Sequence, residues 1–340
     1  MTPRERVLAA LAFRPVDKPA LECSFCGIGL YEHGEKLREL FRTIEGDFGP
    51  VPDDPIPAPP PETIDAAGRY REYRTDAWGV KWAHNIFCGL GHPAEYPLAD
   101  WANLARYQLP PVLQGEYDWA CRSMTEDSER RYFKKAGWVG LFERMHSLRP
   151  FEDVLMDIYD DGPEINHLAD LLVERHKRGL ALLKPDVDAV QMADDFGTQT
   201  AMMLSPAVFR RFFKPRYAEL VSVIKAQNRK ALFHCCGAAF PILEDLRDIG
   251  IDAVWPQINA YGDLKEFAAY CRSIGLAVAI HPERSSLMVR GTPDDIRRKL
   301  FEYADIFHPE EGGSWFYLEI DSGFPYENIE ALVNAVRALR

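Results

Sequence analysis

Short apolar runs alternate with long amphipathic segments along most of this chain. After each run, apolar residues recur every three to four positions, the spacing of one face of an α-helix. Strands buried in a parallel sheet read as continuous apolar runs, because helices cover the sheet. The pattern therefore predicts an α/β fold, a (β/α)8 TIM-like barrel, with an open doubly wound sheet as the alternative. The predicted strands are 20–23, 139–142, 189–192, 231–233, 253–255, 277–280 and 316–320, and the predicted helices are 165–183, 206–226, 238–249, 264–274, 293–306 and 326–339.

The first third of the chain differs from this repeat. Residues up to about Arg14 have the apolar spacing of an amphipathic helix, and the proline-rich run 50–61 predicts an extended surface loop. At 340 residues, a barrel is routinely one domain. We predict a single domain over 1–340. In it, 1–110 form an N-terminal extension with the first strand and the proline-rich loop, and 111–340 carry the main strand–helix units.

Composition excludes several classes of protein. The net charge of −12 disfavours nucleic acid and anionic membranes as partners, since both require a basic face. No apolar run approaches the length of a membrane span, and the charged start around Arg4 and Arg6 lacks the apolar core of a secretory signal. These features predict a cytoplasmic protein with a small-molecule substrate, and they leave the oligomeric state open, with a homodimer as one option.

The cysteines do not form the pattern of a disulfide framework. Their number is odd and small for the length, so in a reducing compartment they are thiols or metal ligands. The Cys23–Cys26 spacing matches a CxxC redox motif but lacks a thioredoxin-like context, and core packing is the preferred interpretation. The seven are Cys23, Cys26, Cys88, Cys121, Cys235, Cys236 and Cys271.

The strongest local signal is FHCCG, in which a predicted strand runs into His234 and Cys236. Alternation along a strand places these two side chains on one face and Cys235 on the other. Imidazole and thiolate are zinc ligands, and a catalytic zinc needs a third protein ligand with one position open. The alternative is a buried histidine beside core cysteines, which are among the most buried residues.

Carboxylates follow other predicted strands. Asp194 and Asp195 end the strand 189–192, and Glu143 follows 139–142. In a barrel the carboxyl ends of the strands meet at one mouth, where catalytic residues lie. We therefore predict catalytic roles for these three residues, and the alternative for one of the aspartates is a helix-capping or turn role.

Further polar side chains at the strand ends are candidates for binding substrate. Gln199, Gln257 and His281 follow three strands, and Arg284 has the geometry to hold a carboxylate or phenolate through two hydrogen bonds. The chain lacks GxGxxG after a strand, GxxxxGK[ST], GxSxG and HExxH, which argues against nucleotide-binding, serine-hydrolase and common zinc-protease functions.

Taken in order, several segments resemble the uroporphyrinogen decarboxylase superfamily over nearly the whole chain. The resemblance implies a distorted (β/α)8 barrel. The segment AAGRYREYRTDAWG, which begins at Ala66, echoes the arginine-rich loop of the porphyrinogen decarboxylases but lies too far along the chain. The similar segments are TPRERVLAALAFRPVDKPA, TDAWGVKW, ADWANLARYQLPP, DDFGTQT with SPAVFRRFFKPRY, LFHCCG, RGTPDDIRRKL and FPYENIEALVNAVRAL.

The branch of this family that moves methyl groups to or from a corrinoid holds zinc through a His-x-Cys pair, which His234 and Cys236 match. Some members take a third ligand, a cysteine, from the loop after the last strand. This chain has Glu319 there, with Asp321 as a second option. The resemblance thus implies a zinc-dependent methyltransferase or O-demethylase that works with a corrinoid on a separate partner protein.

Two other functions stay open at this point. One is a metal-independent decarboxylase in which Arg144 and Arg284 hold carboxylates, and the other is a non-catalytic binding protein on a barrel scaffold. In the leading hypothesis, aromatic side chains wall the substrate pocket, with Trp78, Trp82, Trp255, Phe196 and Phe324 as candidates.

Overall fold

The computed structural model describes residues 1–118 and 127–340. Cys121 therefore lies outside the described residues. The helices are α1 (Pro3–Leu11), α2 (Gly27–Phe41), α3 (Phe142–Leu148), α4 (Phe151–Asp160), α5 (Pro163–Ala181), α6 (Pro206–Val208), α7 (Lys214–Ala226), α8 (Leu243–Asp248), α9 (Leu264–Ser273), α10 (Pro293–Phe307) and α11 (Tyr326–Leu339). The strands are β1 (Leu21–Phe25), β2 (Glu72–Thr75), β3 (Lys81–His84), β4 (His92–Glu95), β5 (Lys135–Val139), β6 (Ala189–Ala193), β7 (Lys230–Cys235), β8 (Ala253–Pro256), β9 (Ala277–Ile280) and β10 (Ser314–Ile320).

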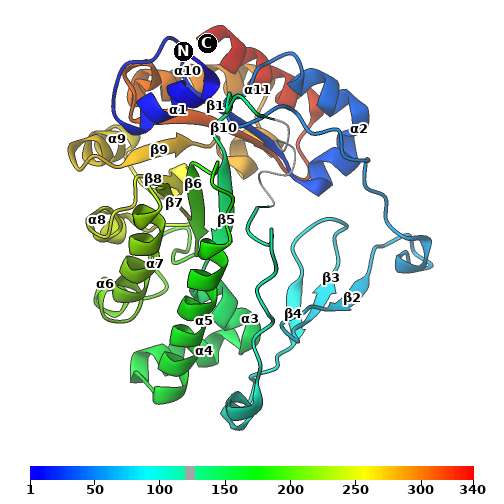
Figure 1. Cartoon of the computed structure of the whole chain (residues 1–340). Helices are drawn as coiled ribbons and strands as arrows, with labels where there is room; N and C mark the ends of the chain where they lie inside the picture. Colours follow the sequence, from blue (N-terminus) through cyan, green and yellow to red (C-terminus); the bar gives the residue numbers. More distant parts are fainter. Residues whose placement is uncertain (119–126) are drawn as a thin grey trace.

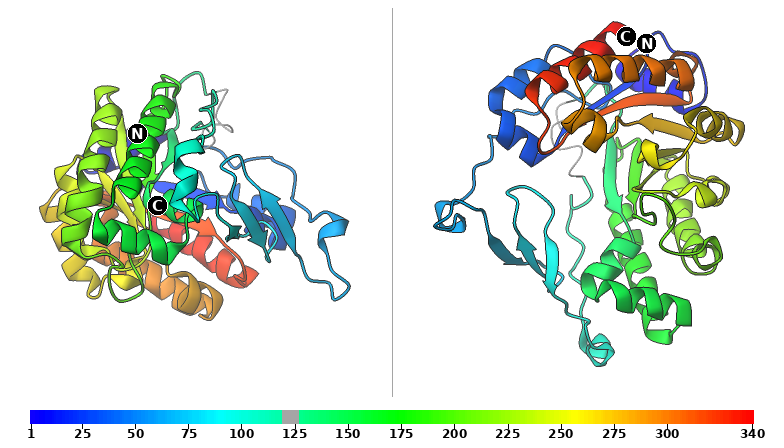
Figure 2. Two further views of the ribbon diagram at one scale, coloured as in Figure 1. Left: turned by 90° about the horizontal axis from the view of Figure 1, so that it is seen from below. Right: turned by 180° about the vertical axis from the view of Figure 1, so that it is seen from behind.

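Seven of the strands form one curved parallel sheet in the order β1-β10-β9-β8-β7-β6-β5. Helices surround its outer side, and both chain termini lie together near α1 and α11 (Figure 1; Figure 2 shows the same arrangement from below and from behind). The α/β class and the curved parallel sheet agree with the sequence prediction. Closure by an eighth strand is not seen among residues 1–118 and 127–340.

Irregular segments fill the space between the edge strands β1 and β5. The Asp47 N–H donates to the Leu21 carbonyl at 2.7 Å, and the Asp47 carbonyl accepts from the Phe133 N–H at 3.0 Å. Nearer the other end of β5, the Tyr117 carbonyl accepts from the Gly137 N–H at 2.7 Å. The two edges of the sheet are therefore bridged, because backbone groups of neighbouring loops pair with them in place of a regular strand.

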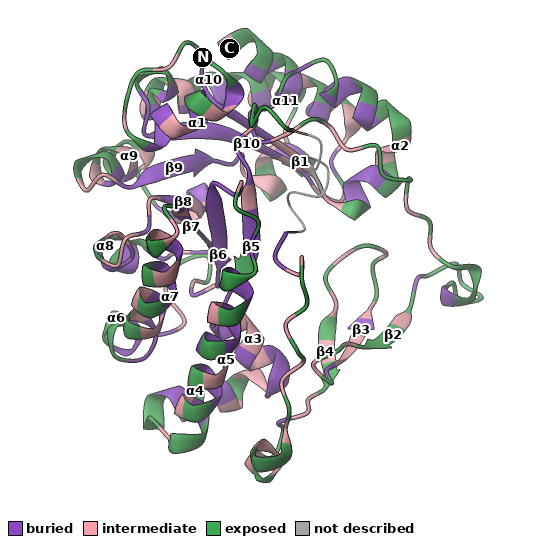
Figure 3. Ribbon diagram, viewed as in Figure 1, coloured by how far each residue is buried: buried purple, intermediate pink, exposed green. Residues whose placement is uncertain are grey.

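The parallel strands are buried almost throughout, as their apolar sequences require (Figure 3). All five residues of β6 are buried, and so are five of the six residues of β7. Between the last residues of these strands and the helices that follow lie the loops that carry the candidate site.

The strand expected at 139–142 lies four residues earlier, as β5, and α3 begins at Phe142. Gly140 follows the strand, and a side chain there would come within 2.3 Å of the Ala193 carbonyl oxygen, so only glycine allows this close approach to β6. The apolar residues Leu141 and Phe142 belong to the start of α3.

A second sheet was not predicted. The strands β2, β3 and β4 form a three-stranded antiparallel sheet that stands apart from the parallel one (Figure 1). The edge strands EYRT and HPAE are largely exposed and the central strand KWAH is half-buried, and none of the three shows a run of apolar residues. The loop 50–60 before it has no regular structure, as predicted. None of the helices in the described part of the chain is long and apolar enough to cross a membrane.

Candidate metal centre and substrate pocket

The His234 and Cys236 side chains lie side by side at the carboxyl end of β7. The Cys236 Sγ is 3.3 Å from the His234 Nε2, and the His234 Nδ1 is 2.9 Å from the Trp255 carbonyl oxygen. A carbonyl accepts a hydrogen bond only from a protonated nitrogen, so this contact places the proton on Nδ1. The Nε2 lone pair is thereby directed at the side where Cys236 lies, the arrangement that metal-binding histidines use.

Asp195 places a third atom that could bind a metal beside this pair. Its Oδ1 lies 3.6 Å from the His234 Nε2 and accepts a 2.7 Å hydrogen bond from the Cys236 N–H. One donor atom from each of Asp195, His234 and Cys236 lies within 4.8 Å of the other two. We call this set the metal centre. The other such group in the described residues, around His308, is fully exposed.

Burial sets the charge state of the metal centre. It lowers the pKa of His234 to about 4, so the ring is neutral near pH 7 and able to bind a cation. Burial and the Asp195 carboxylate raise the pKa of the Cys236 thiol to about 12. A bound cation would reverse the effect on the thiol, because a coordinating thiol loses its proton.

Asp194 has a different environment from its neighbour Asp195. Its side chain is fully buried, and it accepts hydrogen bonds from the N–H groups of Leu141, Phe142 and Glu143 at 2.6, 2.9 and 2.7 Å. The Tyr217 hydroxyl is a fourth donor. These bonds hold the start of α3 against β6, which is the capping role that the sequence left open for one of the two aspartates.

Glu143 lies beside the metal centre, on the first turn of α3. Burial and the Asp195 carboxylate raise its pKa to about 7, while a hydrogen bond from the Trp138 side chain lowers it. The Trp138 ring is 5.8 Å from the His234 ring. The sequence-predicted Glu143 is thus close to the predicted ligands, and it can hold or release a proton near neutral pH.

The two carboxylates expected to complete the metal site are not part of this group. Glu319 contacts the Tyr317 hydroxyl at 3.2 Å and the His281 Nε2 at 3.9 Å. Asp321 pairs with Arg284 at 3.0 Å. The nearest carboxylate to the pair is Asp195, because β6 and β7 are neighbours in the sheet whereas β10 lies three strands from β7.

The other predicted substrate contacts lie around the same mouth. Burial, with the charges of Arg284 and His234, lowers the pKa of His281 to about 3. The Trp255 ring lies 4.0 Å from the His234 ring and 5.8 Å from the His281 ring, so it separates the metal centre from the Glu319 region. Gln199 and Gln257 face each other at 3.3 Å.

A cavity of about 250 Å³ adjoins the metal centre. It lies between α3 and the loop that leads into β3. Of the predicted wall residues, Trp78 and Trp82 line it, whereas Phe196 and Phe324 are buried in the core. The sequence did not single out Trp138, Arg175 or His176, which lie on β5 and α5. The cavity lining is Trp78, Trp82, Glu116, Tyr117, Trp138, Gly140, Glu143, Arg144, Ser147, Arg175 and His176.

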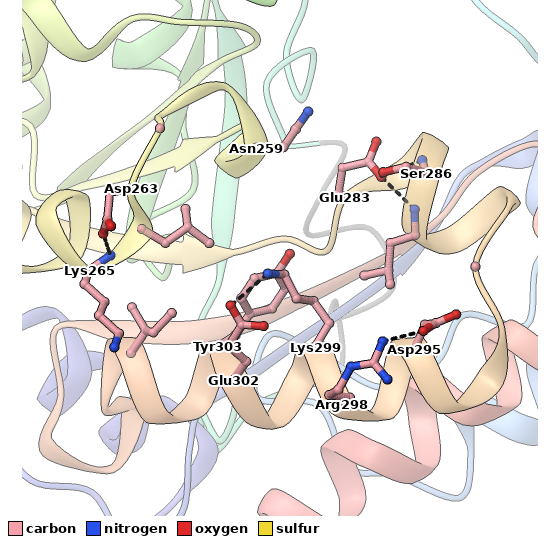
Figure 4. A pocket seen from close by; sticks show the side chains of 15 residues that line it. Asn259, Asp263, Lys265, Glu283, Ser286, Asp295, Arg298, Lys299, Glu302 and Tyr303 are labelled. Carbon is pink, nitrogen blue, oxygen red and sulfur yellow. Dashed lines mark hydrogen bonds and ion pairs between the residues drawn. The ribbon is translucent and has the colours of Figure 1, made fainter.

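A larger cavity, about 760 Å³, lies between the loops after β8 and β9 and helix α10 (Figure 4). Most of its charged side chains already have a hydrogen-bond or ion-pair partner. Arg298 contacts Asp295, Lys299 contacts Glu302 at 2.9 Å, and the Glu283 carboxylate accepts from the backbone of the turn that follows it. Neither cavity is lined by a residue of the metal centre, but only the smaller one is lined by Trp138 and Glu143, which lie beside His234 and Asp195, and we therefore place the substrate site there.

Comparison with known proteins was made by sequence and by structure. The family model described as uroporphyrinogen decarboxylase matches residues 139–339, more than half of the chain. No curated protein matches the sequence. A methyltransferase from Methanosarcina mazei is similar in structure, with a TM-score of 0.63, 17% identity and 99% of each chain covered.

A second solved structure is similar only weakly. It is an endo-beta-1,4-xylanase of glycoside hydrolase family 10 from Gloeophyllum trabeum, with a TM-score of 0.40, 12% identity, and 60% of this chain and 75% of that chain covered. This likeness bears on neither fold nor function.

Proposed function

The chain belongs to the uroporphyrinogen decarboxylase family, and from that premise we propose that it is a zinc-dependent methyltransferase. In this proposal a methyl group moves from a small methoxylated or methylated substrate to a corrinoid carried by a separate protein, or in the reverse direction. The similarity of fold to a methyltransferase supports the reaction type, and an O-demethylase is the form that we favour.

One observation carries the proposal, the metal centre of Asp195, His234 and Cys236. Its nitrogen, sulfur and oxygen donors come from the ends of two adjacent strands and lie within 4.8 Å of one another. Three protein ligands with one open position are the usual composition of a catalytic zinc site. The hydrogen bond to the Trp255 carbonyl fixes the ring in the tautomer that metal binding needs.

These residues fit zinc better than a harder cation. Thiolate and imidazole favour zinc, whereas magnesium and calcium take oxygen ligands. A zinc ion held there would act as a Lewis acid on the substrate's ether oxygen and stabilise the departing alkoxide or phenolate. The set differs from our sequence prediction in one member, because Asp195 takes the place of Glu319.

Other residues at the mouth handle protons and position the substrate. The departing oxygen needs a proton, and Glu143, with a pKa raised to about 7 by burial and by Asp195, can supply one from its carboxyl group. Gln257 orients the turn after β7, since its Oε1 accepts from the Gly237 N–H at 3.0 Å. Asp194 acts through α3 and is a positioning residue, not a catalytic one.

We further propose that the chain is one domain, a (β/α)8 barrel in which the segments around Asp47 and Tyr117 replace the eighth strand. Their hydrogen bonds to the backbones of β1 and β5 support this interpretation.

The experiment is a methyl-transfer assay that uses reduced cobalamin as acceptor and follows methylcobalamin by absorbance. A panel of methoxylated aromatic compounds and methylated thiols is offered to the wild type and to Cys236→Ser, with Cys88→Ser as the control because Cys88 is an exposed thiol. We expect transfer by the wild type and the control only. Equal activity after the metal has been removed would contradict the proposal, and release of carbon dioxide without metal would favour a decarboxylase.

A further inference from the structure

We propose that Arg144 binds a carboxylate of the substrate, so that the substrates are small aromatic acids with one ring. This inference deepens the proposed function. It rests on that function for one point, that the methyl group is the reacting end of the substrate. The carboxylate would lie in the cavity of about 250 Å³, and the reacting methyl group would point toward the metal centre.

Arg144 lacks a carboxylate at hydrogen-bonding distance among the described residues. Its Nη1 is 3.4 Å from the Ser147 Oγ and 3.9 Å from the Asp76 carboxylate. Asp76 is committed elsewhere, since it accepts hydrogen bonds from the Trp78 and Val80 N–H groups and from the Trp82 indole at 2.9, 3.0 and 2.9 Å. Among residues 1–118 and 127–340, the Ser147 hydroxyl is therefore the one side-chain hydrogen-bond acceptor of this guanidinium, which lines the cavity.

The neighbouring Arg175 lines the same cavity, and its guanidinium has hydrogen-bond and ion-pair partners. Its Nη2 contacts both oxygens of Glu116, at 2.8 and 3.0 Å, and its Nε donates to the Pro110 carbonyl at 2.9 Å. Both guanidiniums lie over the Trp78 ring, at 4.2 Å for Arg144 and 4.6 Å for Arg175. The indole holds Arg144 in place, but it does not neutralise the charge.

A half-buried arginine with unused donors is matched best by a planar carboxylate, which accepts two parallel hydrogen bonds from the guanidinium. Burial already disfavours the charge on Arg144 and lowers its pKa. An anionic ligand would offset that cost, whereas a neutral ligand of the same shape would leave it in place.

The other residues that line the cavity indicate which kind of ligand it would hold. Two indoles, those of Trp82 and Trp138, provide flat apolar walls, which suit an aromatic ring, while the Trp78 ring is covered by the two guanidiniums. A volume near 250 Å³ equals that of about eight water molecules, so one substituted ring fits and a tetrapyrrole does not. Trp138 and Glu143 line the cavity and also lie beside His234 and Asp195, so these two residues connect the cavity to the metal centre.

The test compares two ligands of nearly the same shape, the anion 4-methoxybenzoate and the neutral 4-methoxybenzamide, in which an NH2 group replaces one carboxylate oxygen. Binding to the purified chain is measured by titration calorimetry, before and after treatment with a chelator. The variants are Arg144→Gln and Arg144→Lys, with Arg297→Gln as the control because Arg297 is an exposed arginine on α10. We expect the wild type and the control to bind the acid at least about tenfold more tightly than the amide. Arg144→Gln should lose this preference, and Arg144→Lys should keep only part of it.

Equal affinity for acid and amide, an unchanged preference in Arg144→Gln, or no binding of the acid at millimolar concentration would each overturn the inference. If Arg144→Gln does not fold, the ratio of the wild type's affinities for the acid and the amide decides whether the inference holds. The two proposals fail separately. Acid binding through Arg144 in a chain that takes up no zinc removes the proposed function alone, and zinc-dependent methyl transfer without a preference for acids removes the inference alone.

Discussion

The two ends of the parallel sheet differ in how their charged groups are satisfied. At the amino end, the fully buried Asp47 pairs with Arg6 and Arg340 and accepts from the Leu21 N–H at 2.7 Å. At the carboxyl end, the His234 Nε2 lies 3.3 Å from the Cys236 Sγ and 3.6 Å from the Asp195 carboxylate. The amino end is thus a closed set of ion pairs, and the carboxyl end carries a group of candidate metal-binding side chains.

This difference shows which part of the molecule is built for stability and which for chemistry. Barrel enzymes carry catalytic groups at the carboxyl ends of their strands, while the opposite face contributes to stability. The amino-end pairs join segments far apart in the sequence, since Arg6, Asp47 and Arg340 bring the first helix, the loop after α2 and the C-terminus together. Changes at the amino end should therefore alter folding, and changes at the carboxyl end should alter binding.

The largest effect should come from Asp47→Asn. Removing this carboxylate leaves the buried Arg340 guanidinium without its carboxylate partner and Arg6 with Asp17 alone, and breaking a buried pair typically costs about 3–5 kcal/mol in the free energy of unfolding. Chemical denaturation measures the loss, and zinc content per folded chain should not change. A variant that keeps its stability but loses metal would contradict the division between the two ends.

A matched pair within the carboxyl end sharpens the comparison. In Asp194→Asn an amide group would face backbone N–H donors, and we expect a loss of about 2–3 kcal/mol in the free energy of unfolding. In Asp195→Asn the stability should change by less than about 1 kcal/mol, because the side chain is partly exposed and the amide oxygen can still accept from Cys236. Zinc affinity should fall in Asp195→Asn only. The reverse pattern would exchange the roles that we assign.

Acid should lower the free energy of unfolding through His176. This side chain contacts the Tyr117 hydroxyl at 2.7 Å and the Gly140 carbonyl at 3.0 Å. Burial lowers the pKa of His176 to about 4, below its ordinary value of about 6.5, so the unfolded chain takes up the proton first. The stability that the neutral His176 ring provides to the folded chain is complete above about pH 6.5. It is lost as the pH falls toward 4, by up to about 1.4 kcal/mol per pH unit.

Thermal and chemical unfolding between pH 4 and pH 7 measure this slope. His176→Gln should flatten it, and the exposed His308→Gln serves as the control. An unchanged slope in His176→Gln would show that this histidine is not held neutral in the folded chain.

The smallest effect is expected at the rim of the mouth, where Arg284 and Asp321 form an ion pair with both side chains more than a third exposed. Such pairs contribute about 0–1 kcal/mol, so Arg284→Gln should leave the free energy of unfolding nearly unchanged. A loss above about 2 kcal/mol would mean that the rim, like the amino end, is part of the folding core.

Much of this arrangement could be predicted from the sequence, because buried parallel strands carry a strong apolar signal. The alternation along β7 placed His234 and Cys236 on one face, and the structure confirms their proximity. The third donor could not be predicted in the same way. β6 ends at Ala193, before the two aspartates, so alternation does not tell which of them faces the metal centre.

The remaining differences have similar causes. Glu319 was expected as a ligand because it stands near the end of the last strand, but the strand order places it near His281 instead. The strands β2 to β4 are short and contain few apolar residues, and they gave no periodic signal. Arg175 reaches the cavity from the middle of α5, which no rule about strand ends would identify.

The central claim is that the metal centre binds zinc, and metal content tests it most directly. Plasma mass spectrometry is applied to the purified wild type and to Cys236→Ser, Asp195→Asn and the control Cys88→Ser. We predict about one zinc per chain in the wild type and the control, with loss in the other two variants. A wild type without zinc that also fails to take it up when zinc is supplied, or variants that retain it, would contradict the account.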